Sequence, residues 1–360
     1  MTRVLLLITD LEIGGTPSVV RELAIRLRAL GGFEIHVACL ASAGPVATQL
    51  LAEGIPVTAF EARRSSDLWV VRELADLIER RSIEIVFSFL IHANTIAALA
   101  SFMANRVRFI QSIQTTQPRP RWHWRLQRLV HRRAEVVVVP SESVADVAQR
   151  WSRVPREKIR VISNAIDVAD YASITPAPPA KGQPYPIGFI GRLDPIKCVP
   201  DLVEAVLYLG GSVHLHIFGD GPERRAIEAA AQRFGVERLV TLHGAVGRPQ
   251  EALSRIGLLA LPSRAEGFGL VLIEAMAARV PVVATDVPGI RNVVKHNETG
   301  LLVPSGDARA LALAIDQLIR DSQLRATLVE HARQDVERRF AWSSVIQQYR
   351  ALLERPPEPL

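Results

Sequence analysis

Residues 263–277 carry two carboxylates at a spacing that suits a ligand with hydroxyl groups. Glu266 lies in a loop after an apolar run, and Glu274 lies about one turn inside the helix-forming stretch that follows. Gly269 and Leu270 stand at the expected start of that helix, where backbone amides lack intrahelical partners and bind phosphate. Isolated glutamates are often a cap and a solvated helical residue. Here the flanking glycines after an apolar strand favour a binding site for a diphosphate flanked by hydroxyl groups.

Two cations precede this segment in the chain. Arg192 and Lys197 follow the apolar run 187–190, and therefore fall at the carboxyl end of an expected strand, where open α/β sheets bind ligands. They could belong to a solvated loop, or they could neutralise a diphosphate. Together with Glu266 and Glu274 they indicate a nucleoside-diphosphate sugar, which has a ribose diol on one side of its diphosphate and a hexose on the other.

A glycine pair follows the first expected strand. Gly14 and Gly15 allow a close approach of the backbone to a ligand, and we expect Thr16 to cap the next helix with Pro17 in its first position. Such a helix start suits phosphate, although a tight strand-to-helix turn would explain the same residues. The segment is not a GxGxxG, and the acidic residue of a dinucleotide site is not evident.

Short apolar runs rich in β-branched residues alternate with amphipathic helical patterns along the whole chain. This rhythm predicts an α/β fold with parallel sheets and helices on both faces. The expected strands are 4–8, 35–40, 83–89, 108–113 and 136–139, then 187–190, 214–218, 240–242, 258–261 and 281–284, with clear helical patterns at 17–30 and 69–80.

A proline-rich stretch separates the two series of strands. Residues 175–186 contain five prolines in twelve positions, which excludes a helix or a central strand and predicts a stiff linker. The sequence therefore predicts a first domain over 1–170 and a second over 187–340. A chain of 360 residues is long enough for two cores.

Composition narrows the possible compartments. The chain is 48% hydrophobic and 22% charged, and its two cysteines make neither a disulfide framework nor a metal-ligand cluster. The apolar start ends at Asp10, which indicates a buried strand rather than a signal peptide. No run approaches the ~18 apolar residues of a membrane span. We therefore expect a cytoplasmic protein without a bound metal.

Positive charge is concentrated in the first half. Residues 1–168 hold 22 Lys and Arg against 16 Asp and Glu, whereas 169–360 hold 21 of each. Eight arginines and no acid fall between Glu84 and Glu135, which predicts attraction to anions. A basic helical pattern covers 119–133, and its apolar positions include Trp122, Leu126, Leu129 and Val130.

That helical pattern has two interpretations. We expect Trp122 and Leu126 to pack inside the first domain, because a helix on a sheet must bury one face. The alternative is a basic amphipathic helix on an anionic membrane surface. Nucleic acid is not an expected partner, since no recognition motif accompanies the arginines.

These motifs together resemble the retaining glycosyltransferases of family 4, which have the GT-B fold. Glu266 and Glu274, with seven residues between them, match the mark of that family. Arg192 and Lys197 match its diphosphate-binding cations. Further matches cover nearly the whole chain: Gly14-Gly15, 163–167, 219–223, 242–246 with Val246 beside the base, and 340–342.

The resemblance implies two Rossmann-like domains facing across a cleft, with a terminal helix over about 341–360 crossing back to the first. It implies a UDP-sugar or GDP-sugar donor and retention of configuration. The implied catalytic residues are Glu266, Arg192, Lys197 and His92, and the implied donor-binding residues are Gly14, Gly15, Arg192, Lys197, Val246, Gly269, Leu270 and Glu274. No Asp-x-Asp motif occurs, so we expect the two cations to act in place of a metal.

The chain departs from the family pattern at several positions. Cys198 stands where glycine usually follows the lysine, and Ala165 replaces the glycine that closes the first domain. Thr16 and Pro17 replace the usual Ala-Glu after the glycine pair. Gln114 takes the place of a sugar-contacting histidine, and His92 is its nearest substitute.

Three classes of function remain at this stage. The first is a glycosyltransferase that acts on a cell-envelope glycan, lipid-linked or other acceptor, as a peripheral protein on the inner face of the cytoplasmic membrane. The alternatives are a GT-B sugar-nucleotide epimerase and a nucleotide-sugar-binding pseudoenzyme, the latter suggested by Cys198, Gln114 and Ala165.

Overall fold

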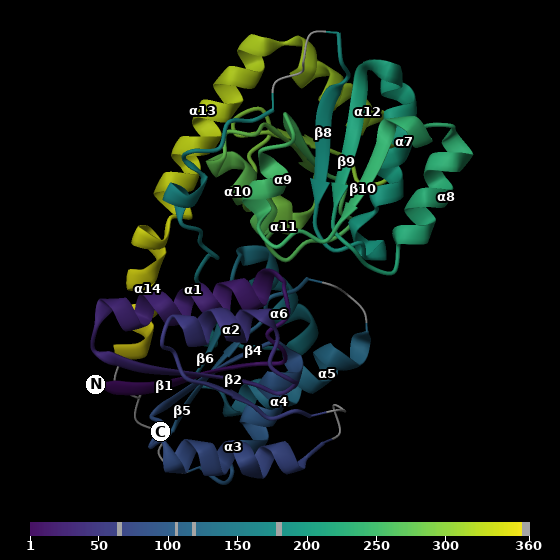
Figure 1. Cartoon of the computed structure of the whole chain (residues 1–360). Coiled ribbons are helices and arrows are strands. Elements are labelled where there is room, and N and C mark those ends of the chain that lie inside the picture. Colours follow the sequence, from purple (N-terminus) through teal and green to yellow (C-terminus); the bar gives the residue numbers. More distant parts are fainter. Residues whose placement is uncertain (63–66, 105–106, 117–119, 178–181, 355–360) are drawn as a thin grey trace. The chain divides into compact units, whose positions relative to one another are not determined.

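The computed structural model describes residues 1–62, 67–104, 107–116, 120–177 and 182–354. The chain divides into two compact units, Met1–Asn164 with Ser343–Leu360, and Ala165–Trp342 (Figure 1). The division falls before the expected linker, because Ile166 and Tyr171 already belong to the core of the second unit. Part of the expected linker, 178–181, and the end of the expected terminal helix, 355–360, lie outside the described residues.

The first unit contains a seven-stranded parallel sheet in the order β3-β2-β1-β4-β5-β6-β7. Helices lie on both faces, with α1 and α2 on one side and α3 and α4 on the other (Figure 1). The strands are β1 (Thr2–Ile8), β2 (Phe33–Cys39), β3 (Val57–Ala59), β4 (Ile85–Phe89), β5 (Arg108–Ser112), β6 (Val136–Val139) and β7 (Ile159–Val161). The helices are α1 (Gly15–Leu30), α2 (Pro45–Ala52), α3 (Trp69–Arg80), α4 (Ile91–Ala100), α5 (Arg121–Val130) and α6 (Glu142–Ser152).

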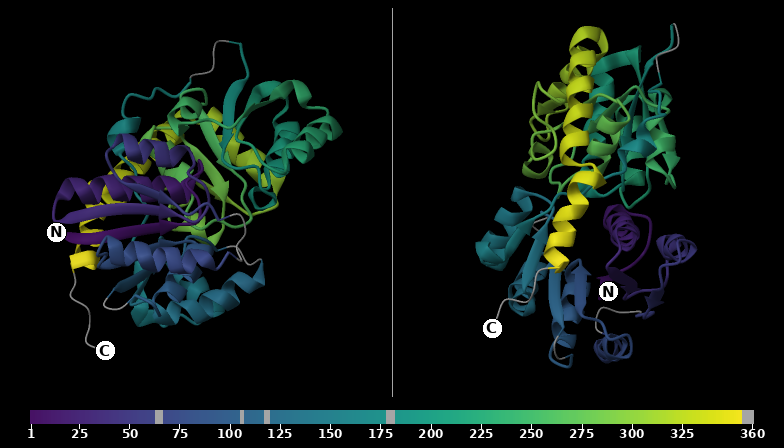
Figure 2. Two further views of the ribbon diagram at one scale, coloured as in Figure 1. Left: turned by 60° about the horizontal axis from the view of Figure 1, so that its bottom comes forward. Right: turned by 90° about the vertical axis from the view of Figure 1, so that its left-hand side faces the viewer.

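The terminal helix α14 (Trp342–Glu354) completes the first unit. The Tyr349 ring is 1% exposed and lies 6.2 Å from the Phe87 ring of β4. Arg108 of β5 donates to the carbonyl oxygens of Leu353 and Leu352, at 2.9 and 3.2 Å. These contacts confirm that the helix returns to this unit. The yellow helix can be followed to the first sheet in Figure 2.

The second unit contains a six-stranded parallel sheet in the order β10-β9-β8-β11-β12-β13. Helices α7 and α8 lie on one face, and α9 and α10 lie on the other (Figure 1). The strands are β8 (Tyr185–Ile190), β9 (Val213–Phe218), β10 (Val240–Gly244), β11 (Leu258–Leu261), β12 (Val282–Thr285) and β13 (Leu301–Val303). The helices are α7 (Val199–Leu209), α8 (Arg224–Phe234), α9 (Pro249–Leu253), α10 (Leu270–Ala277), α11 (Pro288–Arg291), α12 (Ala308–Arg320) and α13 (Ser322–Arg339).

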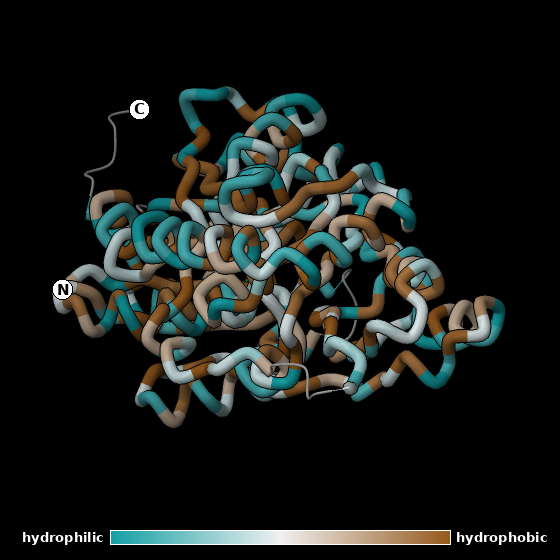
Figure 3. Tube along the Cα trace, turned by 90° about the horizontal axis from the view of Figure 1, so that it is seen from above, coloured by the Kyte–Doolittle hydropathy of each residue, from teal (hydrophilic) through white to brown (hydrophobic). Residues whose placement is uncertain are grey.

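Strand burial follows the apolar runs of the sequence. β6, β11 and β12 are buried at every position, as expected for parallel strands covered on both faces. Peripheral helices change between hydrophilic and hydrophobic residues along each turn, as amphipathic helices do (Figure 3). The expected α/β architecture with two parallel sheets is confirmed. Among the described residues, no helix combines the length and apolar character that crossing a membrane requires.

The orientation of α5 differs from our expectation. Trp122 is 49% exposed, and the buried face consists of Trp124, Gln127 and Val130. A glutamine can occupy the core face because its amide is bonded within the unit. Gln127 donates to the Gln111 side chain at 3.0 Å and accepts from the Asn94 side chain at 3.2 Å. The expectation that Trp122 packs inside the first domain was therefore wrong.

Helix α1 also begins differently from our expectation. It starts at Gly15 with Gly14 as the N-cap residue, and the Ser18 amide donates to the Gly14 carbonyl oxygen at 3.1 Å. No side chain caps this end. Thr16 therefore lies inside the first turn rather than at the cap, and the glycine pair itself forms the helix start.

Candidate functional site

The second sheet changes direction between β8 and β11. From β8 the chain continues to β9 on one side, and from β11 it continues to β12 on the other. Open α/β sheets bind ligands outside the carboxyl ends of strands at such a switch point. The loops 191–198 and 262–269 follow these two strands. The amide of Arg264 donates to the carbonyl oxygen of Ile196 at 2.8 Å, so the two loops are directly joined.

Lys197 and Glu266 meet where these loops join. The Nζ atom of Lys197 lies 2.5 Å from Oε2 of Glu266, and the side chains are 20% and 14% exposed. The Ser263 hydroxyl donates to the same carboxylate oxygen at 3.2 Å. The Thr285 hydroxyl donates to the Ser263 carbonyl at 2.5 Å and so connects this turn to the end of β12. The Glu266 carboxylate is therefore held from two sides.

Arg192 lies in the same loop as Lys197 but has a different partner. Its Nε atom lies 3.1 Å from Oδ2 of Asp194, and its side chain is 73% exposed. The loop is held by a turn that follows β9. A Cβ atom on Gly219 would lie 1.9 Å from the Gly191 carbonyl oxygen, so only glycine permits this approach. The Arg192 side chain is therefore an exposed cation on a fixed backbone.

The start of α10 lies directly after Glu266. Gly269 has φ +83°, a left-handed conformation that suits glycine, and Leu270 is the first helical residue. A Cβ atom on Gly289 would lie 1.8 Å from the Glu266 carbonyl oxygen, so α11 packs closely against this loop. The arrangement presents the first amides of α10 beside the Lys197–Glu266 pair. Free amides at a helix start and a lysine ammonium group are both groups that can bind phosphate.

Glu274 lies one turn further along α10 in a less polar environment. Burial raises the pKa of its carboxyl group from 4.5 to about 7, although a hydrogen bond with the Tyr171 side chain acts in the opposite direction. Tyr171 is itself buried, at 6% exposed. Protonated and ionised forms of Glu274 are therefore both accessible near neutral pH.

The expected donor residue Val246 and the departure from the family pattern at Cys198 both lie in segments that follow strands of this unit's sheet. Val246 follows β10 and is partly buried against the core. Cys198 has φ +50°, which explains why glycine suits this position, and its side chain is buried. Burial raises the pKa of the Cys198 thiol, so the side chain acts as a small apolar group rather than a thiolate.

The first unit has its own switch point between β1 and β4. Gly14 and Gly15 follow β1, and His92 follows β4 in the first turn of α4. Leu90, immediately before α4, has φ +72°, an uncommon conformation that costs energy and is concentrated at functional sites. Burial lowers the pKa of His92, so its imidazole is neutral at pH 7 and can accept a proton.

The side chain of Gln114 is held by structural hydrogen bonds and does not contact His92 through them. Its Nε2 atom donates to the Ser112 hydroxyl at 2.6 Å, and its Oε1 atom accepts from the Asn164 side chain at 3.4 Å. The ring of His92 instead neighbours Trp122 and His123 of α5, with ring centroids 6.1 and 5.7 Å apart. His92 therefore lies at the carboxyl edge of the sheet together with α5.

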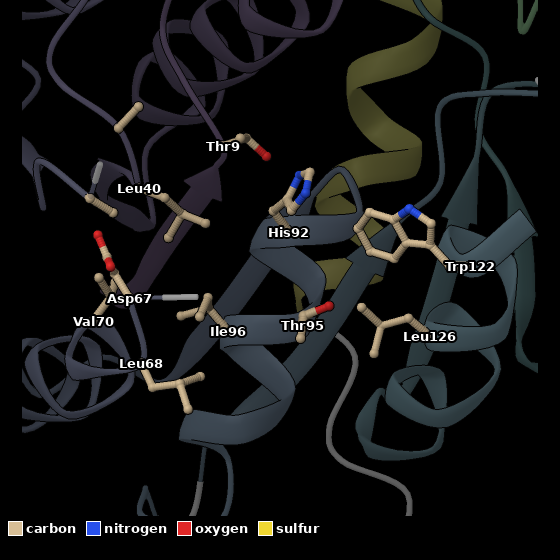
Figure 4. Close-up of a pocket in the computed structure, with 12 residues that line it drawn as sticks. Thr9, Leu40, Asp67, Leu68, Val70, His92, Thr95, Ile96, Trp122 and Leu126 are labelled. Carbon is tan, nitrogen blue, oxygen red and sulfur yellow. The ribbon is translucent and has the colours of Figure 1, made fainter. Parts of the chain in front are cut away.

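A cavity of about 260 Å³ opens beside His92 (Figure 4). Its walls come from the segments that follow β1, β2 and β3 and from helices α3, α4 and α5. The lining residues are Thr9, Leu40, Ala41, Ala62, Asp67, Leu68, Val70, His92, Thr95, Ile96, Trp122 and Leu126.

Sequence patterns did not identify most of the residues that support these sites. Ser263 and Tyr171 touch Glu266 and Glu274, but neither residue belongs to a recognisable spacing. Asp194, the partner of Arg192, could have been found as an acid two positions from a cation in one loop. The apolar cavity residues are indistinguishable from core residues in the sequence.

Two Rossmann-like units, each with polar residues at the switch point of a parallel sheet, define a protein of the GT-B class. The structure of Anabaena HepE in complex with UDP and glucose shares this fold with a TM-score of 0.88, at 23% identity over 98% of this chain and 99% of that chain. A family model described as Glycosyltransferase Family 4 matches residues 13–170, and one described as Glycosyl transferases group 1 matches residues 172–335. The two matches lie in the two halves of the chain, which belongs to the family 4 glycosyltransferases.

Two relatives are similar over more than half of this chain. The D-inositol 3-phosphate glycosyltransferase of Corynebacterium urealyticum is 32% identical over 257 residues, 62% of this chain and 58% of that protein. The phosphatidyl-myo-inositol mannosyltransferase of Mycobacterium leprae is 34% identical over 223 residues, 59% of this chain and 58% of that protein. The chain thus spans just over half the length of these curated relatives.

Proposed function

We propose that this protein is a retaining glycosyltransferase that moves a sugar from UDP-sugar or GDP-sugar to an anionic acceptor of the cell envelope. The observation that carries the proposal is the Lys197–Glu266 pair beside the start of α10, at the switch point of the second sheet. A cation, a carboxylate and helix amides at one point suit a diphosphate joined to a sugar.

Each residue of the second unit has a role in this proposal. Glu266 accepts hydrogen bonds from the transferred hexose, and Glu274 accepts them from the ribose. Lys197, the exposed Arg192 and the amides of Gly269 and Leu270 stabilise the negative charge that develops on the leaving diphosphate. Val246 contacts the base. In the first unit, the helix start at Gly14 and Gly15 suits a phosphate group.

The reaction itself needs neither a metal nor a covalent nucleophile in this account. Arg192 and Lys197 supply the positive charge that a divalent ion supplies in metal-dependent transferases. The leaving phosphate takes the proton of the acceptor hydroxyl, and the new bond forms on the face of the sugar from which the diphosphate departs. The donor configuration is therefore retained in the product.

The acceptor belongs to the first unit in this proposal. Its excess of arginine attracts an anionic molecule, and neutral His92 at the carboxyl edge of the sheet can accept a hydrogen bond from a hydroxyl group. Two relatives bear names with anionic acceptors, inositol phosphate and phosphatidylinositol. The exposed arginines of α5 support the proposal that the protein acts at the inner face of the cytoplasmic membrane.

A panel of nucleotide sugars tests the proposal. The purified chain is incubated with UDP- and GDP-sugars and with inositol 3-phosphate, alkyl phosphates or envelope glycans, and products are identified by mass spectrometry and proton NMR. We expect a glycosylated acceptor in which the transferred sugar has the same anomeric configuration as in the donor. Conversion of one nucleotide sugar to another would indicate an epimerase, and nucleotide binding without any product would indicate a binding protein. Either result would overturn the proposal.

A further inference from the structure

The cavity of the first unit has a chemical character that a sugar site does not need. Most of its lining is hydrocarbon, including Leu40, Ile96 and Leu126 on three different segments. Sugar hydroxyl groups that lose water without gaining hydrogen bonds cost free energy, so a sugar ring fits poorly among such walls. The cavity therefore selects for an apolar group.

The size of the cavity limits what that group can be. A cavity of about 150 Å³ lined by apolar side chains is enough to bind benzene. The volume of about 260 Å³ is therefore sufficient for a short hydrocarbon segment or one ring system, and it is too small for a complete lipid. Only the part of the ligand next to its polar group can lie inside.

The polar groups of the cavity are divided, because the Asp67 carboxylate lies beside Val70 and away from His92, whereas Thr9 lies nearer to His92. In Figure 4, Thr9 and His92 lie on one side, and Leu68 and Ile96 lie away from them. The imidazole of His92 packs near the indole of Trp122, which is half-exposed at the rim. A ligand with its hydrocarbon inside can thus place a hydroxyl group near His92.

Helix α5, which supplies Trp122 to the rim of the cavity, also carries positive charge. Trp122 and Leu126 of α5 line the cavity one turn apart, and Arg125 lies three positions after Trp122, where helix side chains are neighbours. Arg125 and Arg121 are exposed. A ligand anion outside the cavity would meet these guanidinium groups, which bind phosphate well.

We propose that this cavity binds the hydrocarbon part of an amphiphilic acceptor, while Arg121 and Arg125 bind the anionic group attached to it. The inference rests on the proposed transferase function and names its acceptor class: a phosphorylated amphiphile rather than a free sugar. A neutral alkyl glycoside and inorganic phosphate each carry only half of the recognised features.

Calorimetric titration of the whole chain with butyl, hexyl and octyl phosphate tests the proposal. We expect affinity to rise about fourfold for each added methylene until the cavity is full, since this is the value of burying one methylene. Octyl glucoside should bind at least tenfold more weakly than octyl phosphate, and inorganic phosphate should show no measurable heat. Affinity that ignores chain length would overturn the proposal.

Two variants locate the binding. Ala41 is partly exposed and lines the cavity, so Ala41→Phe should fill it and remove the dependence on chain length. Ala52→Phe makes the same change at an exposed position at the end of α2 and should leave the series intact. Arg125→Gln should weaken octyl phosphate at least fivefold without changing octyl glucoside. An unaltered series in Ala41→Phe would place the ligand elsewhere and contradict the proposal.

The nucleotide separates this inference from the proposed function. UDP or GDP binding is measured in every variant, and we expect it to be unchanged. Transfer to short neutral acceptors without any preference for chain length would refute the cavity proposal and leave the transferase intact. Binding of alkyl phosphates as described, with no transfer from any nucleotide sugar, would support the cavity and refute the transferase.

Discussion

The Nζ atom of Lys197 lies 2.5 Å from Oε2 of Glu266, although 69 positions separate the two residues in the sequence. The contact joins the loops after β8 and β11, the two strands at which the second sheet changes direction. An ammonium group has three donors, so the bond to Glu266 leaves donors for a phosphate. The pair therefore places a phosphate-binding cation and a hydroxyl-binding carboxylate in contact before any ligand arrives.

The two glutamates should differ in what their removal affects. Glu274→Ala should weaken UDP or GDP binding by roughly 1.5–3 kcal/mol, the value of a charge-assisted hydrogen bond, because its proposed partner is the ribose. Glu266→Ala should leave nucleotide binding within about 0.5 kcal/mol and lower transfer, because its proposed partner is the hexose. Calorimetry and transfer assays separate these effects.

Glu330→Ala, at an exposed position of α13, is the matched control and should change neither quantity. Equal losses of nucleotide affinity in Glu266→Ala and Glu274→Ala would contradict the division of roles.

Donor binding should depend on pH through Glu274. Burial raises the pKa of this carboxyl group to about 7 in the free protein, and only the ionised form accepts hydrogen bonds from both ribose hydroxyls. Below pH 7 the affinity should therefore fall by up to about tenfold per pH unit. UDP-glucose is the suitable ligand, because its phosphates lack the ionisation near pH 6 of a terminal phosphate.

The same shift has a consequence for stability. The folded protein binds a proton on Glu274 up to about pH 7, whereas the unfolded chain releases it near 4.5, so this contribution is present at low pH and is lost as pH rises through 7. Glu274→Gln should remove the contribution of this group to the pH dependence of donor affinity and to the pH dependence of stability. A pH profile for UDP-glucose that is identical in wild type and Glu274→Gln would show that another group is responsible.

Nucleotide binding should survive removal of divalent ions. Arg192 and Lys197 supply the charge that would otherwise require a metal, so the affinities for UDP and GDP should be the same with and without EDTA. Lys197→Met should lower both, by roughly 1.5–3 kcal/mol. Binding that is lost in EDTA and restored by Mg²⁺ would refute this part of the account.

Helix α5 should recruit the protein to anionic membranes. Arg121, Arg125 and Arg128 lie on a helix that also exposes Trp122 and Leu129, at 49% and 60%. Sedimentation with vesicles should show binding to anionic but not to neutral lipid. Binding should weaken with salt, since exposed charges are screened within ~8 Å at physiological ionic strength. Replacing the three arginines by Gln should weaken it at least fivefold.

The control for this experiment removes the same charge elsewhere. Arg72, Arg80 and Arg81 are exposed on or next to α3, and their replacement by Gln should leave vesicle binding largely intact. If both triple variants lose binding equally, net charge rather than α5 determines it. A wild type that ignores anionic vesicles would contradict recruitment to the membrane by α5.

Most of the fold could be read from the sequence because its strands are buried on both faces. Such strands appear as short runs of β-branched residues, and β6 and β11 lie where the runs 136–139 and 258–261 predicted them. The orientation of α5 could not be predicted in the same way. Its two faces both carry a tryptophan, and the choice between them depends on Gln127 finding partners on β5 and α4.

In the candidate sites, too, the sequence predicts which residues lie at the sheet edge but not the contacts that depend on tertiary packing. Glu266 and Lys197 could be proposed from spacing because a loop after a strand must lie at the sheet edge, but their direct contact depends on how two distant loops pack. The raised pKa of Glu274 follows from burial, which outweighs the opposing hydrogen bond with Tyr171, and a spacing shows neither effect. The cavity draws residues from several distant segments, and no local pattern marks them.

The most direct test of the central claim is a crystal structure with UDP bound. We expect ordered density for the diphosphate within hydrogen-bonding distance of Lys197 Nζ and of the Leu270 amide, with the ribose hydroxyls bonded to Glu274. We expect the same position in crystals grown with EDTA. Density for UDP at any other place on the protein, or a diphosphate held through a metal ion away from Lys197, would contradict the account.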